Sequence, residues 1–244
     1  MQSFWGDDVK GIEFTPLPPP QKGFPLLSGL GESAQMPFYE TISIRPQTQL
    51  HLWKIEESLE QLAEGLSLQE RSRQKLDKLK AVTHQKGFLA VRQLLVHLGF
   101  TDADVQYDPN GKPLLSNGQH ISISHSHDFA AVAISNENLG LDAEAMRPKV
   151  LHIAPRFMDI ETHLAGLTLS EQLQKATIIW SIKEAVFKIK NEKGISYPNH
   201  ISEHPFSFAD GKTTARLDFN QCTELFPVHF IQREDYIFVC AFES

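Results

Sequence analysis

The stretch Trp180-Ser181-Ile182-Lys183-Glu184-Ala185-Val186-Phe187-Lys188 places charged residues among apolar ones at helical spacing. Trp180, Glu184 and Lys188 follow one another at intervals of four residues. A helix over this stretch therefore places them on one face. The simplest interpretation is a surface helix on which Glu184 and Lys188 form an ion pair, while Trp180 packs into the core. A functional interpretation depends on a second stretch, about forty residues earlier.

That second stretch, Leu139-Gly140-Leu141-Asp142-Ala143-Glu144, alternates apolar and acidic residues and predicts a strand. Asp142 and Glu144 project from one face of such a strand. Two carboxylates on one face repel each other unless a proton or a cation lies between them. A hard divalent cation such as Mg²⁺ or Mn²⁺, which prefers oxygen ligands, is the simplest reason to place them there. A solvent-facing acidic edge strand is the alternative.

A strand that precedes these carboxylates ends in polar side chains. It is predicted over Ile121-Ser122-Ile123-Ser124-His125-Ser126-His127, where apolar and polar residues alternate. Hydroxyl and imidazole groups gathered where a strand stops favour a site at that end. His125 and His127 are also candidates for metal binding. No third His, Cys or carboxylate accompanies them at ligand spacing, however, which disfavours a metal there.

The segment between residues 71 and 92 is strongly basic. Its cations are Arg71, Arg73, Lys75, Lys78, Lys80, Lys86 and Arg92, and the opposing acid is Asp77. Such a run is commonly a solvated helix face. In an acidic protein, a phosphorylated ligand is the other partner that would supply the missing counter-charge.

The composition is that of a globular protein with an acidic balance. The 244 residues, 41% of them hydrophobic, suffice for one large domain or two small ones. The formal net charge of −7 argues against a general nucleic-acid-binding protein. Cys222 and Cys240 lack metal-binding spacing and predict free thiols in a reduced compartment. Since neither a membrane-spanning run nor a signal peptide is recognisable, we expect a cytoplasmic protein without a membrane segment.

The chain divides into an N-terminal arm, which is rich in proline and glycine, and two halves. Residues 1–35 predict a poorly ordered arm, and we hypothesise that Met36 is the natural start. Residues 36–135 form an N-terminal half, and residues 136–244 form a C-terminal half that carries the metal site. The predicted fold is α+β, with two similar α/β halves in a pseudo-twofold arrangement. Each half has a small, mostly antiparallel sheet packed on a long helix.

Three local signals predict where elements begin or turn. Ser67 and Glu70 have the spacing of a capping box at a helix start. Ser170 is the expected cap of the long helix that runs to Lys190. Asp210-Gly211 predicts a hairpin turn between two strands.

Four motifs together resemble those of the 4′-phosphopantetheinyl transferase superfamily, and specifically its larger, surfactin-type branch with two similar halves. They are Gly111-Lys112-Pro113, Ile123-Ser124-His125-Ser126, Gly140-Leu141-Asp142-Ala143-Glu144 and the stretch from Trp180 to Lys188. Their order and spacing are also similar, and the resemblance covers roughly residues 50 to 242. The pair of the last two motifs is the most specific signal.

The resemblance implies an Mg²⁺-dependent enzyme. It would transfer the 4′-phosphopantetheine arm of coenzyme A to a serine of an acyl or peptidyl carrier protein and release adenosine 3′,5′-bisphosphate. It would act as a monomer, with no nucleic-acid partner. A non-catalytic, coenzyme A-binding or regulatory member of the same fold is the alternative.

The resemblance also implies roles for individual residues. Asp142, Glu144 and Glu184 would hold Mg²⁺ against the pyrophosphate. Glu184 would accept the serine proton, directly or through a metal-bound water, and Lys188 would offset charge on the leaving phosphate. The residues implied to contact coenzyme A are Arg71, Arg73, Lys86, Lys112, Pro113, Ser124, His125 and Lys183. Of these, Ser124 and His125 would touch phosphate, and Lys112 and Pro113 would border the adenine.

One departure from the family pattern concerns the basic segment. The family usually has a cation directly before the Phe-Leu pair, whereas this chain has Gly87 there and Lys86 one residue earlier. Which of Arg71, Arg73, Lys86 and Arg92 binds the 3′-phosphate is therefore left open. An unrelated Mg²⁺-dependent phosphotransferase would normally show a glycine-rich phosphate loop, and neither usual form of it occurs.

Overall fold

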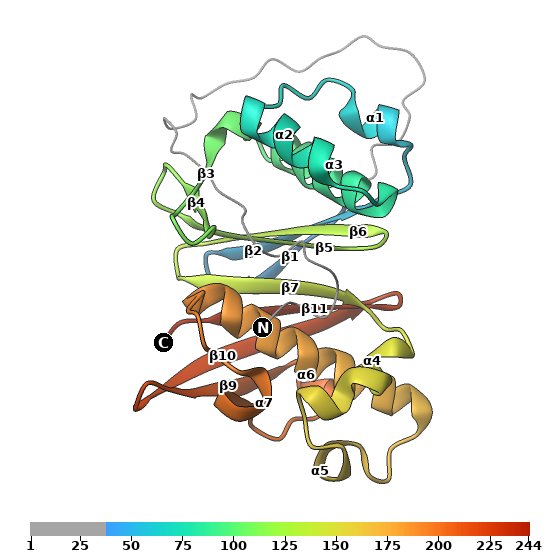
Figure 1. Cartoon of the computed structure of the whole chain (residues 1–244), viewed down its shortest axis with the longest axis vertical. Helices are drawn as coiled ribbons and strands as arrows, with labels where there is room; N and C mark the ends of the chain where they lie inside the picture. Colours follow the sequence, from blue (N-terminus) through green and yellow to red (C-terminus); the bar gives the residue numbers. More distant parts are fainter. Residues whose placement is uncertain (1–37) are drawn as a thin grey trace.

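The computed structural model describes residues 38–244. The predicted arm of residues 1–35 and the hypothesised start at Met36 lie outside the described residues. Two antiparallel sheets pack face to face, and helices cover the outer face of each sheet, as Figure 1 shows. The expected α+β fold, with an antiparallel sheet and one long helix in each half, is confirmed.

The N-terminal half builds a six-stranded sheet in the order β1-β2-β6-β5-β4-β3. Its strands are β1 (Phe38–Arg45), β2 (Thr48–Lys54), β3 (Val105–Tyr107), β4 (Pro113–Leu115), β5 (His120–Ser126) and β6 (Phe129–Ser135). Its helices are α1 (Leu59–Ala63), α2 (Glu70–Lys78) and α3 (Val82–His97). Phe88 and Leu94 of α3 join one core with Trp53 and Val132 of the sheet, so α3 is the helix that covers this sheet.

The C-terminal half builds a five-stranded sheet in the order β7-β11-β10-β9-β8. Its strands are β7 (Leu139–Ala145), β8 (Ile201–Glu203), β9 (Lys212–Phe219), β10 (Cys222–Arg233) and β11 (Tyr236–Phe242). Its helices are α4 (Lys149–Ile153), α5 (Ile160–Leu164), α6 (Leu169–Lys190) and α7 (Tyr197–His200). Although α6 has 22 residues, no helix of residues 38–244 combines the length and apolarity needed to cross a membrane.

The two halves share a core between their sheets. Phe238 and Phe242 of β11 lie in one apolar cluster with Leu50, Leu52 and Phe129 of the opposite sheet. Neighbouring β11 residues point the other way, into the cluster under α6. Both faces of β11 are thus buried, and each large apolar side chain buried there contributes about 1.5–3 kcal/mol.

Gly140 sets how closely α6 approaches β7. A Cβ atom at this position would lie 1.9 Å from the carbonyl oxygen of Ala185. No side chain tolerates so short a contact with backbone. Glycine therefore lets the middle of α6 lie directly against the acidic strand, which brings Glu184 next to the carboxylates of β7.

Two of the predicted helix caps are wrong. Ser67 does not cap α2, which begins at Glu70; instead Asp102 accepts hydrogen bonds from the backbone of Gln69 at 2.8 Å and from the hydroxyl of Ser72 at 2.9 Å. Asp102, which is distant in sequence, thus accepts the hydrogen bond at the start of α2 that Ser67 was predicted to accept. The long helix α6 is capped by Thr168, with Glu171 completing the capping box, rather than by Ser170.

The turn predicted at Asp210-Gly211 lies between two paired antiparallel strands, β8 and β9, as expected, but their connection runs over residues 204–211 and is longer than a two-residue hairpin turn. Asp210 and Gly211 end a short 3₁₀ helix, Phe208–Asp210, which precedes β9. A two-residue hairpin turn lies at Asn220 and Gln221, which connect β9 to β10 and have φ angles of 50° and 63°. Two consecutive residues with positive φ form the tight turn that strand twist favours, although Gln rarely adopts it.

Candidate functional site

Three carboxylates meet where β7 lies against α6. Asp142 and Glu144 extend from β7, and Glu184 extends from α6. The strand register pairs Asp142 with Val239 and Glu144 with Ile237, both of which pack toward α6. Asp142 is only 4% exposed and Glu184 only 6%. The structure thus brings the three acidic residues singled out in the sequence into one largely buried group.

The three carboxylates perturb one another strongly. Burial, followed by repulsion from Asp142, raises the pKa of Glu144 to about 8. The same two causes raise the pKa of Glu184 to about 7. The positive charge of Lys188 opposes both pKa shifts. Near neutral pH this group therefore favours the addition of positive charge, either as protons or as a cation.

Lys188 is the cation nearest to the group. Its Nζ donates to Oδ1 of Asp142 at 2.9 Å, to the carbonyl of Leu141 at 2.8 Å and to the hydroxyl of Ser124 at 3.1 Å. The side chain is thus directed from α6 across to β7 and β5. The sequence suggested Glu184 as its partner along the helix, but the structure pairs it with Asp142 on the neighbouring strand.

The donor set fits a hard divalent cation in chemical kind. It consists of carboxylate oxygens, and Oδ2 of Asp142 is fully buried without a hydrogen-bond partner. A buried carboxylate oxygen of this sort is one that a bound cation would satisfy. As they stand, however, no three His, Cys, Asp or Glu side chains among residues 38–244 are arranged to hold a metal ion. The fit therefore lies in the type of donor, because the three carboxylates as a set are not yet placed to share one ion.

Two aromatic residues hydrogen-bond to the carboxylates and were not assigned that role from the sequence. The indole nitrogen of Trp180 donates to Oε1 of Glu144 at 3.1 Å. The hydroxyl of Tyr197, in α7, is hydrogen-bonded to Glu184 and lowers its pKa. The position of Trp180 on the stripe with Glu184 was a signal for the first contact. Tyr197 follows the helix in a separate segment, and no periodicity pointed to it.

The Gly111-Lys112-Pro113 turn docks onto the C-terminal half near the end of α6. Nζ of Lys112 donates to the side chain of Asn138 at 2.5 Å and to the carbonyl of Ile189 at 3.2 Å. Burial lowers the pKa of Lys112. Pro113 begins β4. Both residues implied to border the adenine therefore lie at the seam between the halves, toward one end of α6.

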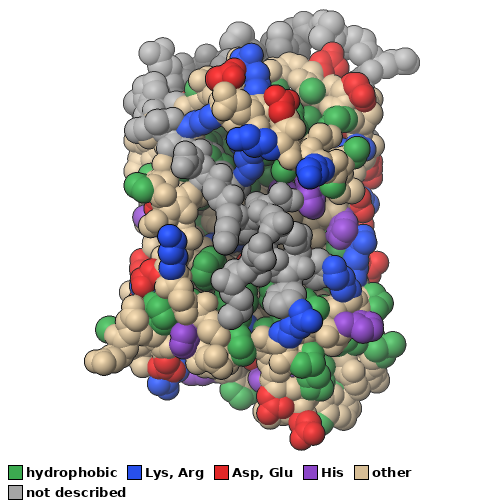
Figure 2. All heavy atoms as spheres, viewed as in Figure 1, with side chains coloured by type: hydrophobic (Ala, Val, Ile, Leu, Met, Phe, Trp, Pro, Cys, Tyr) green, Lys and Arg blue, Asp and Glu red, His purple; other side chains and the backbone are tan. Residues whose placement is uncertain are grey.

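The basic residues of the N-terminal half lie on and around α2 and α3. Three of the four candidates for 3′-phosphate binding each donate to a backbone carbonyl. Arg71 donates to Val105 at 2.8 Å, Arg73 to Leu68 at 2.7 Å and Lys86 to Glu57 at 2.5 Å. Figure 2 shows Lys and Arg side chains on the upper part of the viewed face, over the helices of this half.

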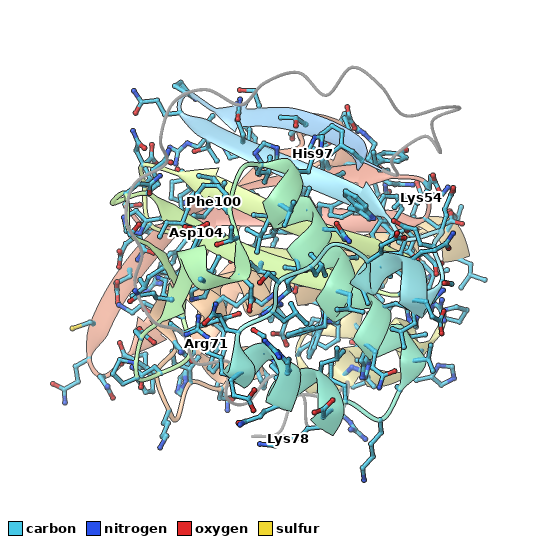
Figure 3. All side chains as sticks on the ribbon, turned by 90° about the horizontal axis from the view of Figure 1, so that it is seen from above. Lys54, Arg71, Lys78, His97, Phe100 and Asp104 are labelled. Atoms are coloured by element: carbon cyan, nitrogen blue, oxygen red, sulfur yellow. The ribbon has the colours of Figure 1, made fainter. Side chains whose placement is uncertain are left out.

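These cations differ in how accessible they are. Seen from above, Arg71 lies between α2 and the segment leading into β3, whereas Lys78 lies at the rim of the molecule (Figure 3). Arg92 is buried: it pairs with Asp102 at 3.3 Å and stacks 3.6 Å over the ring of Phe88. The basic segment is thus partly a solvated helix face and partly core. Arg92, the fourth candidate for 3′-phosphate binding, belongs to the core.

His125 explains the departure at Gly87. A Cβ atom on Gly87 would lie 2.5 Å from Nδ1 of His125, so the exposed imidazole occupies the space that a side chain would need. The ring of His84 lies 6.3 Å away, centroid to centroid. A cation at position 87 would therefore displace His125, and Lys86 is directed instead to the carbonyl of Glu57.

Lys183 lies in a different place from the other implied contacts. Its ammonium is buried and donates to the carbonyls of Tyr197, at 3.2 Å, and Ile201. Glu203 lies 3.6 Å away as its counter-ion. Lys183 thus ties α6 to α7 and β8, and its implied contact with coenzyme A stays a prediction.

No family model matches the chain. The chain is similar to curated proteins named 4′-phosphopantetheinyl transferase. It is 35% identical to 4′-phosphopantetheinyl transferase psf-1 of Bacillus pumilus over 112 residues, which cover 44% of this chain and 47% of that relative. It is 29% identical to gsp of Aneurinibacillus migulanus over 107 residues, 42% of this chain and 45% of the relative. With Sfp of Bacillus subtilis strain 168 it shares 33% identity over 92 residues, 36% of this chain and 41% of the relative.

The matched part spans less than half the length of each of these relatives. Within that part, the matches confirm the resemblance to the 4′-phosphopantetheinyl transferase superfamily and its surfactin-type branch.

Proposed function

We propose that this chain transfers 4′-phosphopantetheine from coenzyme A to a serine of an acyl or peptidyl carrier protein and releases adenosine 3′,5′-bisphosphate. The observation that carries the proposal is the buried group of Asp142, Glu144 and Glu184 with the ammonium of Lys188 against it. Phosphoryl-type transfer asks a protein mainly for positioning and charge neutralisation, which this group would supply once it holds a divalent cation. The names of the similar bacterial proteins, 4′-phosphopantetheinyl transferases, support the same activity.

Asp142, Glu144 and Glu184 are the residues that we propose to hold Mg²⁺. Their oxygen donors suit this ion, and the unpartnered oxygen of Asp142 offers a ligand that no protein group satisfies. When bound, Mg²⁺ would neutralise charge on the pyrophosphate of coenzyme A.

The bond changes of the proposed reaction assign a role to Glu184. The serine oxygen of the carrier forms a bond to the phosphorus that bears the pantetheine arm. The bond from that phosphorus to the oxygen of the departing adenosine bisphosphate breaks, and the serine proton goes to Glu184. Without a bound ion, burial and Asp142 raise the pKa of Glu184 to about 7. A bound cation would favour the ionised carboxylate, which is the form that accepts a proton.

Lys188 serves the leaving group in this proposal. Its ammonium is held by Asp142, Ser124 and the carbonyl of Leu141, so it is fixed before a ligand arrives. A fixed positive charge stabilises the negative charge that develops on the leaving phosphate without the cost of ordering a free side chain.

Recognition of coenzyme A is assigned to residues around this group. Ser124 and His125, on β5, are proposed to contact phosphate, and Lys112 and Pro113 to border the adenine. The 3′-phosphate is proposed to bind among Arg71, Arg73 and Lys86. Each of these cations now donates to a backbone carbonyl, so a phosphate would replace neutral acceptors by a charged one.

The test is to incubate the protein with coenzyme A, Mg²⁺ and a panel of apo carrier proteins and to measure intact carrier masses. We expect at least one carrier to gain a phosphopantetheine mass, and the Glu184→Gln variant to add none while remaining folded. Binding of coenzyme A by calorimetry without transfer to any carrier would reject this function in favour of a non-catalytic coenzyme A-binding protein.

A further inference from the structure

Three serines on alternate positions of β5 face β7. Their hydroxyl oxygens accept hydrogen bonds from alternate backbone N–H groups of that strand. The bonds join Ser122 to Leu141 at 2.8 Å, Ser124 to Ala143 at 3.2 Å and Ser126 to Ala145 at 3.3 Å. This serine ladder crosses from the N-terminal half to the C-terminal half.

The ladder occurs where the C-terminal sheet ends. β7 is the edge strand of that sheet, and its other side pairs with β11. Its outward N–H groups therefore have no strand partner, and a buried N–H left without an acceptor costs about 1–3 kcal/mol. The serine hydroxyls satisfy these groups in place of another strand.

Ser126 has a second partner. A hydroxyl carries one hydrogen, and because its oxygen accepts from the N–H of Ala145, that hydrogen is free to be donated. Oε2 of Glu144 lies 3.2 Å from the Ser126 oxygen and receives it. The other oxygen of Glu144 accepts from the indole of Trp180 at 3.1 Å. Each carboxylate oxygen of Glu144 is thus held by a donor from a different half of the molecule.

We propose that Ser126 is a positioning residue that, together with Trp180, holds the carboxylate of Glu144 in place for a divalent cation. The inference rests on the proposed function and deepens it, because it concerns the same acidic group. A ligand carboxylate oriented by donors of this kind binds its ion without first losing rotational freedom.

Ser122 provides a matched control within the same ladder. It also accepts from a backbone N–H of β7, at 2.8 Å. The β7 residue before its partner is Gly140, which has no side chain, whereas the corresponding residue next to Ser126 is Glu144. Replacing Ser122 by alanine therefore removes a ladder bond without touching a carboxylate.

The experiment measures Mn²⁺ binding by electron paramagnetic resonance in the wild-type chain and in Ser126→Ala, Ser122→Ala and Ser126→Thr, and measures the urea unfolding midpoint of each. We expect Ser126→Ala to weaken Mn²⁺ binding about tenfold. Ser122→Ala should stay within about twofold of wild type despite a similar loss of stability, and Ser126→Thr should retain affinity because it keeps the hydroxyl.

Equal Mn²⁺ affinities for Ser126→Ala and Ser122→Ala would overturn the positioning role while leaving the proposed transfer intact. A wild-type chain that binds Mn²⁺ but modifies no carrier would overturn the proposed function and leave the positioning role standing. A folded wild-type chain that binds no Mn²⁺ would overturn both.

Discussion

The Nζ atom of Lys188 lies 2.9 Å from Oδ1 of Asp142, while Oδ2 of the same carboxylate is buried without a hydrogen-bond partner. One side of Asp142 is thus neutralised by the protein, and the other side is left for something that the protein does not supply. In our proposal this second side is where Mg²⁺ binds. This placement of Asp142, and the close contacts at Gly87 and Gly140, lead to four predictions.

Asp142→Asn should lower the rate of phosphopantetheine transfer at least about a hundredfold, because it removes a charged ligand and the partner of Lys188. Folding should be retained, since repulsion from Asp142 disfavours the charged forms of Glu144 and Glu184. Carrier mass spectrometry measures the rate and urea unfolding the stability. Glu224→Gln, which removes a carboxylate 2.9 Å from Lys190 of the same helix, serves as the control and should leave the rate unchanged.

The metal-free protein should lose stability as pH rises through the neutral range. The pKa of Glu144 is raised from 4.5 to about 8, and that of Glu184 from 4.5 to about 7. At a pH between the ordinary pKa of 4.5 and these raised pKa values, the folded state holds more protons than the unfolded state. The free energy of unfolding therefore falls as pH rises from about 5 to about 8.

The difference in unfolding free energy between wild type and Glu144→Gln, measured in urea with a chelator from pH 5 to 8.5, isolates this effect from the histidines. The wild type should weaken relative to the variant as pH increases. Added Mg²⁺ should reverse much of that loss at the alkaline end, because it favours the ionised carboxylates. A pH-independent difference would contradict the assignment.

Gly87→Ala should raise the KM for coenzyme A about tenfold with little change in stability. The new Cβ would displace the exposed imidazole of His125, whose Nδ1 lies 2.5 Å from the position of that atom. Alanine also suits a helix better than glycine by about 1 kcal/mol, which offsets the crowding. The control is the His125→Ala background, in which Gly87→Ala should have no further effect on KM. An additive effect there would show that the substitution acts elsewhere.

Gly140→Ala should destabilise the protein by about 3 kcal/mol or more. The added Cβ would meet the backbone oxygen of Ala185 at 1.9 Å, and a helix backbone cannot turn aside as a side chain can. Urea unfolding measures the loss. A change below about 1 kcal/mol would mean that α6 can move away from β7 freely, and the close approach of Glu184 to Asp142 would then lose its structural basis.

Much of the site followed from local periodicity. Alternation over 139–144 placed Asp142 and Glu144 on one strand face, and four-residue spacing put Glu184 and Lys188 on one helix face. These relationships depend only on the geometry of a single element, so a sequence is enough to predict them. The overall α+β class followed in part for the same reason, because the alternation of the strands and the helical spacing from Trp180 to Lys188 are local patterns.

Contacts between distant segments were beyond that reasoning. The cap of α2 comes from Asp102, some thirty residues after the helix begins, and the true partner of Lys188 is on another strand. Lys183 and Lys188 are both lysines of one helix, yet one is buried against β8 and the other faces the carboxylates. Which helix face meets which neighbour is decided by packing, which local spacing does not encode.

The serine ladder determines whether one half can be expressed without the other, and whether the halves of two proteins can be exchanged. An isolated C-terminal fragment would expose the bare N–H groups along β7, and an unprotected strand edge readily pairs with another copy and aggregates. The N-terminal half thus covers the exposed edge of β7 and protects the C-terminal half from aggregation. If the N-terminal half were exchanged for that of another protein, the chimera would stay soluble only if the new half kept serines at the alternate positions of β5.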